Sequence, residues 1–250
     1  MSDERGGRET QEALDTLVRE LRAVFGASLR AVVLYGPAAG DEPATAAELH
    51  TLVVVDELPL ERLEEGGAHV EAWVRGGRPS PLVLTFAEWR SSADVFPVEY
   101  ADILTRHRVL HGALPTEGIA VEPRHLRLAV EREAVGALLQ LRRGVLASGS
   151  DPGRRASMLA ASLAGVLPLF RGALRVHGLQ PPTDAGEVCR ELGFRAGIDA
   201  APFVRVLEHR RAAAPIGAAA VHDMLAGYLA GLERLVAHLD QVQPAGGPVS

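Results

Sequence analysis

The sequence predicts an α+β protein in which a mixed-sheet domain is followed by an all-α helical bundle. All strand-like apolar runs lie before residue 115. After Pro115 the apolar residues recur only at spacings of three and four, which is the spacing of amphipathic helices. We therefore expect a sheet domain over residues 10–115 and a helical bundle over residues 120–243.

The first half alternates helix and strand patterns. A helical stripe of Leu14, Leu17 and Leu21 is ended by Gly26. The remaining apolar runs are short, rich in Val and Leu, and separated by Gly or Pro. The expected elements are a helix over 10–25, strands over 29–35 and 48–55, a helix over 60–75, a strand over 82–86 and strand-like residues over 98–108 that lead into 109–112.

The second half contains helix signals only. Pro123 stands where a helix would begin, and Gly149 and Pro152 end the long stripe that follows it. A second helix contains Pro168, a residue that kinks or breaks helices, and Thr183 or Asp184 could cap the next one. The expected helices cover 126–146, 154–177, about 184–192, 201–211 and 218–239.

Composition excludes several classes of function. The chain has 47% hydrophobic residues and a formal net charge of −6, which argues against general nucleic-acid binding. It contains no lysine, so neither a P-loop nor a pyridoxal-phosphate Schiff base can form. We expect a cytoplasmic protein without a membrane span, because the chain has one cysteine, no signal-peptide pattern and no uncharged apolar run of about 18 residues.

A strand that ends in a glycine turn is the most informative motif. Leu29–Tyr35 leads into Gly36 and Pro37, and a second strand follows from Glu48 through His50. This arrangement resembles the core of the nucleotidyltransferase superfamily, in which the turn reads Gly-Ser and the next strand opens Asp-x-Asp. The segment 94–112 is also similar to a stretch of bacterial nucleotidyltransferase-like proteins. The resemblance implies a helical C-terminal half like that of kanamycin nucleotidyltransferases or of the helical partners in toxin–antitoxin systems.

The chemistry that the resemblance implies is only partly present. Two Mg²⁺ ions in that family need several carboxylate ligands. Glu48 could replace the first Asp, but His50 replaces the second, and a neutral imidazole is a poor ligand for Mg²⁺. Pro37 offers the phosphates neither an N–H nor a hydroxyl. The strand at 82–86 supplies no carboxylate before Glu88.

We therefore expect a catalytically degenerate nucleotidyltransferase-like protein that acts as a nucleotide-binding module or as a regulatory or interaction module. Its candidate nucleotide-binding residues are Gly36, Pro37 and His50. The alternative is an active enzyme that uses Glu48 with Glu99 or Asp102 to hold Mg²⁺ and transfers a nucleotide from a nucleoside triphosphate to a small molecule or protein. A third interpretation is a partner or oligomer protein whose helical half carries the function. The degenerate form needs no metal. The expected partners are a nucleotide and a protein or a second copy, with no membrane and no nucleic acid.

Other chemically active residues have simpler explanations. Glu99 and Asp102 form an acidic pair near the sheet that could also be merely solvated. His107 and His111 are four residues apart, a metal-binding spacing only on a helix, and they lie in a strand-like segment. Arg171 and His177 resemble the pair of helical toxin RNases, but their spacing of six places them on different helix faces, which favours an ordinary surface pair. Cys189 is expected to pack as a small apolar group.

Overall fold

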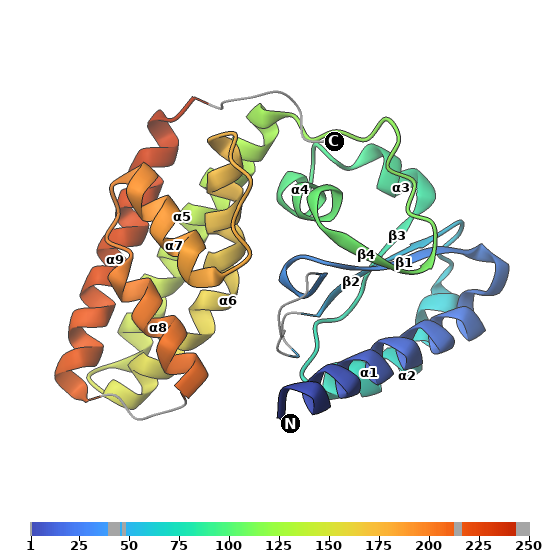
Figure 1. Cartoon of the computed structure of the whole chain (residues 1–250), viewed down its shortest axis with the longest axis horizontal. Coiled ribbons are helices and arrows are strands. Elements are labelled where there is room, and N and C mark those ends of the chain that lie inside the picture. Colours follow the sequence, from blue (N-terminus) through green and yellow to red (C-terminus); the bar gives the residue numbers. More distant parts are fainter. Residues whose placement is uncertain (1, 40–45, 47–48, 213–216, 244–250) are drawn as a thin grey trace. The chain divides into compact units, whose positions relative to one another are not determined.

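A computed structural model describes residues 2–39, 46, 49–212 and 217–243 of the chain. It divides into two compact units, the first ending at Val121 and the second beginning at Glu122. In the described residues, the first unit holds a mixed four-stranded sheet with four α-helices, and the second holds α-helices joined by loops and no strand (Figure 1). The α+β class expected from the sequence is confirmed.

The sheet has the strand order β3-β2-β1-β4. Strand β1 (Leu29–Tyr35) pairs antiparallel with both β2 (His50–Val55) and β4 (His107–Gly112), whereas β2 and β3 (Leu82–Thr85) are parallel. Because parallel neighbours need a crossover connection, the chain passes through helix α2 (Leu60–Arg75) between β2 and β3. The sheet is therefore mixed, and β1 lies in its interior.

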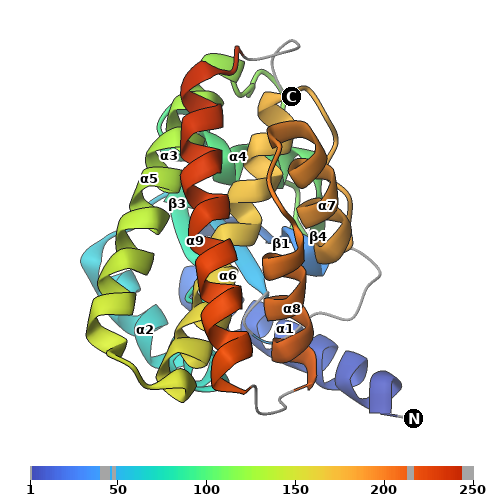
Figure 2. The ribbon, with the colours of Figure 1, turned by 90° about the vertical axis from the view of Figure 1, so that its left-hand side faces the viewer.

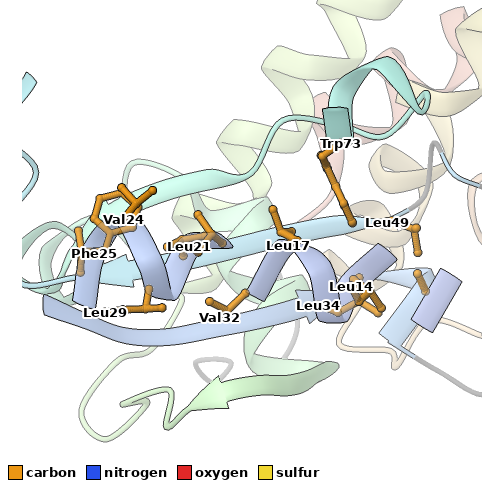
Figure 3. Packing of buried hydrophobic residues seen from close by; sticks show 13 residues of the cluster. Leu14, Leu17, Leu21, Val24, Phe25, Leu29, Val32, Leu34, Leu49 and Trp73 are labelled. Atoms are coloured by element: carbon orange, nitrogen blue, oxygen red, sulfur yellow. The ribbon is translucent and has the colours of Figure 1, made fainter. Parts of the chain in front are cut away.

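One face of the sheet is covered by α1 (Ser2–Phe25) and α2 (Figure 1). Helix α1 begins earlier than the expected residue 10. Its apolar stripe packs on alternate residues of β1 and β2, because successive strand residues point to opposite faces. The resulting core includes Leu14, Leu17, Leu21, Val24, Val32, Leu34, Leu49, Val53, Val55 and Trp73, most of which are labelled in Figure 3. This packing leaves Tyr35 and its cross-strand neighbours for the other face.

The opposite face is covered by α3 (Phe86–Ser91) and α4 (Pro97–Thr105), as Figure 1 shows. Helix α4 corrects the sequence expectation, since residues 98–108 had been expected to be strand-like. Pro97 occupies the first turn, where its missing N–H costs nothing, and six residues of α4 are buried. Tertiary burial therefore overrides the β propensity of Val98, Tyr100 and Ile103, and β4 begins only at His107.

The second unit contains the α-helices α5 (Pro123–Ser148), α6 (Pro152–Val176), α7 (Ala185–Ala196), α8 (Ala201–Ala212) and α9 (Ala218–Gln241), shown from one side in Figure 2. Asp151 caps α6 and Asp184 caps α7 through hydrogen bonds to backbone N–H groups. Helix α6 continues through Pro168. Phe203 lies at the centre of the core, 4.9 Å from the Phe170 ring and 4.3 Å from the Tyr228 ring between centroids.

Helix α6 is the one helix, among the described residues, that is long and apolar enough to span a bilayer. In the structure 56% of its most apolar window is buried, and its side chains pack against neighbouring helices of the same unit. The length and the apolar composition of α6 are therefore consistent with its place in the core of the second unit.

Candidate functional site

The turn after β1 is built on Gly36. Its φ of +75° lies in the left-handed region that glycine adopts at little cost. The Gly36 carbonyl accepts a hydrogen bond from Ala39 N at 3.1 Å, which closes a short 3₁₀ turn over Pro37–Ala39. A Cβ at Gly36 would meet no atom within 4 Å. Backbone conformation, and not crowding by the described residues, therefore explains why glycine stands here.

Three ring side chains form a row across the sheet next to this turn. Tyr35, the last residue of β1, pairs in register with His50 on β2 and with His107 on β4. The Tyr35 and His50 ring centroids are 5.7 Å apart, with the rings tilted by 36°. We refer to these three residues as the strand-end row. Tyr35 was not among the candidates expected from the sequence, although its position directly before the glycine turn is a usable signal.

Helix α4 brings two carboxylates to the strand-end row. Burial, followed by the negative charges of Glu99 and Asp102, raises the pKa of the Tyr35 hydroxyl to about 12. Asp102 is buried, with 9% of its surface exposed, so it is not the solvated residue that its sequence alone allows. The structure therefore brings Glu99 and Asp102 together with Tyr35 at the end of β1.

His107, the first residue of β4, is held in one tautomer by a carbonyl of helix α4. Its Nδ1 lies 2.7 Å from the carbonyl oxygen of Ile103. A carbonyl can only accept, so Nδ1 carries the proton, and in the neutral ring Nε2 is left as an acceptor. His107 can thus receive a proton or a hydrogen bond from a ligand at the strand-end row.

The carboxylates expected for metal binding do not form a cage in the described part of the chain. Strand β3 contains no acidic residue, and Glu88 is engaged in a capping box with Thr85, to whose backbone N–H its Oε2 is bound at 2.7 Å. No group of three or more metal-binding side chains is found among the described residues. Glu48 lies outside the described residues. Besides the two α4 carboxylates, the described side chains of the strand-end row are imidazole and phenol groups, which are poor ligands for Mg²⁺.

The other residues singled out in the sequence lie outside the strand-end row. His111 lies in β4, the strand that begins at His107, as expected. Arg171 is buried and donates from Nη2 to the Thr183 carbonyl at 3.0 Å, which corrects the expectation of a surface residue. His177 instead contacts His238 on α9, with their Nε2 atoms 2.9 Å apart. Burial raises the pKa of the Cys189 thiol to about 12, as expected for a packed apolar group.

Comparison with known proteins establishes the class of fold. No protein-family model matches the chain, and no curated protein matches it in sequence. The structure is similar to a crystal structure of the Enterococcus spectinomycin adenyltransferase AAD(9) with ATP and spectinomycin. The TM-score is 0.60 at 13% sequence identity, over 92% of this chain and 99% of that chain. The chain therefore has a nucleotidyltransferase-like fold.

Proposed function

We propose that this chain is a catalytically degenerate nucleotidyltransferase-like protein of the bacterial cytoplasm that binds a nucleotide and serves as a regulatory or interaction module. The composition of the site carries the proposal. The Gly36 turn is retained at the end of β1, while β3 offers no carboxylate and its nearest acidic residue, Glu88, is used to cap α3. A phosphate bound at this turn would find no metal cage among the described residues to position it.

The side chains around the turn suit binding better than phosphoryl transfer. His50 and His107 can exchange hydrogen bonds with a nucleotide, and the Tyr35 ring next to them offers a surface for stacking. The hydroxyl of Tyr35 is protonated at neutral pH, as for an ordinary tyrosine, and its raised pKa of about 12 holds the proton still more firmly, so it acts as a hydrogen-bond donor and not as a base. These groups can hold a ligand, but they supply little to neutralise a triphosphate that is being cleaved.

The second candidate function is an active Mg²⁺-dependent nucleotidyltransferase. One observation favours it. Glu99 and Asp102 both act on Tyr35, which pairs with His50, and Glu48 precedes His50 by two residues in the sequence. Glu48 would then join the α4 carboxylates as a metal ligand, and the product would be a nucleotide attached to a small molecule or protein. Such a role requires these three carboxylates to act together.

Calorimetric titration with ATP separates the two functions. The degenerate protein is expected to bind ATP equally well in EDTA and in Mg²⁺, and to release no pyrophosphate. An active enzyme would instead require Mg²⁺ for tight binding and lose it in Glu48→Ala and in Glu99→Ala. Glu61→Ala is the matched control, because Glu61 is an exposed carboxylate on α2, which covers the other face of the sheet. The absence of any ATP binding would contradict both functions.

A further inference from the structure

A groove of about 550 Å³ lies between helix α1 and strand β4 in the first unit, and we call it the α1–β4 groove. Its apolar lining includes Val18 on α1 and Leu110 on β4, both of which are partly buried against the core. Among the described residues β4 has a neighbouring strand on one side only, so the groove lies at an edge of the sheet. Its volume falls in the range of roughly 300–1,000 Å³ that ligand sites occupy.

Three arginines line the α1–β4 groove: Arg19 and Arg22 on α1 and Arg108 on β4. Arg108 pairs in register with Leu34, whose side chain belongs to the core beneath α1, so Arg108 projects to the α1 side of the sheet. Its Nη1 donates to Gln11 Oε1 on α1 at 3.1 Å. The groove is therefore separate from the strand-end row, which lies on the other face of the sheet.

The lining of the groove is positively charged. No ion pair of these three arginines is found in the part of the chain that the structure describes, and Arg19 donates from Nη2 to a neutral hydroxyl, Thr16 Oγ1, at 3.2 Å. The carboxylate in the lining is that of Asp15, whose Oδ1 accepts a hydrogen bond from Gln11 Nε2 at 2.8 Å. Three arginines and one aspartate give the lining a formal charge of +2, in a chain whose formal net charge is −6.

The positive charges lie at two places along the groove. Arg108 is held beside Gln11 by their hydrogen bond. Arg19 and Arg22 follow Gln11 by eight and eleven residues, which at about 1.5 Å per residue places them about 12 to 17 Å further along α1. In an extended peptide, residues i and i+4 share a face and lie about 13 Å apart, because each residue adds about 3.3 Å. Acidic residues at i and i+4 of such a peptide therefore match the two places.

We propose that the α1–β4 groove binds an extended acidic peptide of another protein, with carboxylates at i and i+4 and an apolar side chain at i+2. Charge complementarity identifies this occupant, because the lining is positive although the chain as a whole is negative. The residue at i+2 shares a face with both carboxylates, so it meets the apolar lining of the groove while they meet the arginines. Each part of the lining thus has a counterpart in the peptide.

The edge of β4 adds a smaller contribution. An extended peptide can pair its backbone with an exposed sheet edge. Leu110, however, has no partner in the register between β4 and β1, and such an irregularity bends a strand and limits further pairing. The arginines are therefore expected to provide most of the affinity. Since exposed ion pairs are individually weak, we expect a dissociation constant on the order of 10 μM to 1 mM at low salt.

Fluorescence anisotropy of the full chain, without nucleotide, tests the proposal. The probe is a fluorescein-labelled pentapeptide with glutamate at its first and fifth positions, leucine at the third and serine at the other two. It should bind saturably, and more weakly as salt is added. A peptide with glutamine in place of both glutamates, and one with the two glutamates moved next to each other, should each bind at least about fivefold more weakly. The second of these keeps the charge of the probe and changes only the spacing.

Substitutions in the groove test the same contacts from the side of the protein. Arg22→Gln and Arg108→Gln should each weaken binding about two- to fivefold, because each removes one exposed ion pair to the peptide. Asp15→Asn should tighten binding by a similar factor, because it removes the negative charge of the lining. Arg75→Gln is the matched control and should leave binding unchanged. Arg75 is an exposed arginine of the same unit that is paired with Glu71 on α2, outside the groove.

Several outcomes would overturn the proposal. These are no binding of the probe at up to about 2 mM protein, equal binding of the glutamine peptide, weaker binding by Asp15→Asn, or equal effects of Arg22→Gln and Arg75→Gln. Single-stranded oligouridine that binds more tightly than the probe and is weakened by Arg22→Gln would identify the groove as a nucleic-acid site and would also overturn it. ATP plays no part in these measurements, so their outcome is independent of the proposed nucleotide site.

Discussion

Gly36 gives the most direct test of the nucleotide site, through the substitution Gly36→Ala. The added Cβ would meet no atom within 4 Å, so its cost comes only from the φ of +75°. An L-residue in the left-handed region costs about 1–2 kcal/mol. Gly77, which follows α2 in the same unit, has a φ of +76°, and a Cβ there would likewise meet no atom within 4 Å, although Gly77 is exposed and Gly36 is buried. Gly77→Ala should therefore destabilise the protein by the same amount.

The two variants should differ in ATP binding. A methyl group at residue 36 keeps a phosphate from approaching the turn and removes at least one charge-assisted hydrogen bond to it. Such a bond contributes about 1.5–3 kcal/mol, which corresponds to a loss of affinity of roughly ten- to 150-fold. Gly77→Ala should bind ATP as the wild type does.

Calorimetry measures the affinities, and urea unfolding of both variants checks that their stabilities match. The urea midpoints of the two variants are compared with each other, because a chain of two units need not unfold in one step and then has no single free energy of unfolding. Equal ATP affinity in Gly36→Ala and Gly77→Ala would refute the role of the turn, since backbone strain would then be its only consequence.

Two further predictions concern the helical unit. Burial and nearby positive charges lower the pKa of both His177 and His238. As the pH falls through about 6.5, these histidines therefore take up protons in the unfolded chain before they do so in the folded chain. The free energy of unfolding should decline from that pH downward. The urea midpoint should therefore fall between pH 7.5 and 5.5, and fall less in His238→Gln. Gly231→Ala should lower the midpoint, because its Cβ would lie 2.6 Å from the Phe203 ring, whereas Gly165→Ala, with no atom within 4 Å, should raise stability by about 1 kcal/mol.

Each of these predictions has its own check. His222→Gln changes an exposed histidine at the other end of α9 and should keep the wild-type response to pH. If it reduces the response as much as His238→Gln does, the contact between His177 and His238 is not the cause. A stabilised Gly231→Ala would mean that the Phe203 ring moves aside at no cost.

Local sequence signals predicted most of the secondary structure. Gly26, Gly36 and the Gly76-Gly77 pair end their elements as expected, because glycine adopts turn conformations that other residues avoid. Pro123 and Asp184 begin or cap helices through their own backbone and side-chain chemistry. These signals act within a few residues and do not depend on the rest of the fold.

The segment over 98–108 shows where local reasoning fails. Its Val, Tyr and Ile content favours a strand, yet α4 covers the sheet and buries Val98, Tyr100 and Ile103. The Tyr100 ring stacks on Trp89 at 4.4 Å between centroids, and its hydroxyl donates to the Trp89 carbonyl at 2.9 Å. The gain from these tertiary contacts exceeds the small intrinsic preference for a strand.

The sequence by itself determined the α+β class, the glycine turn after β1 and the scarcity of acidic residues on the next strands, because residue type and short-range spacing are enough to show them. Only the tertiary structure decided that Glu99 and Asp102 act on Tyr35, that Glu88 is bound to Thr85 and that arginines from α1 and β4 line one groove. Those facts depend on strand register and on how helices pack over long sequence separations. Many weak contacts fix that packing together, and no single short motif encodes it.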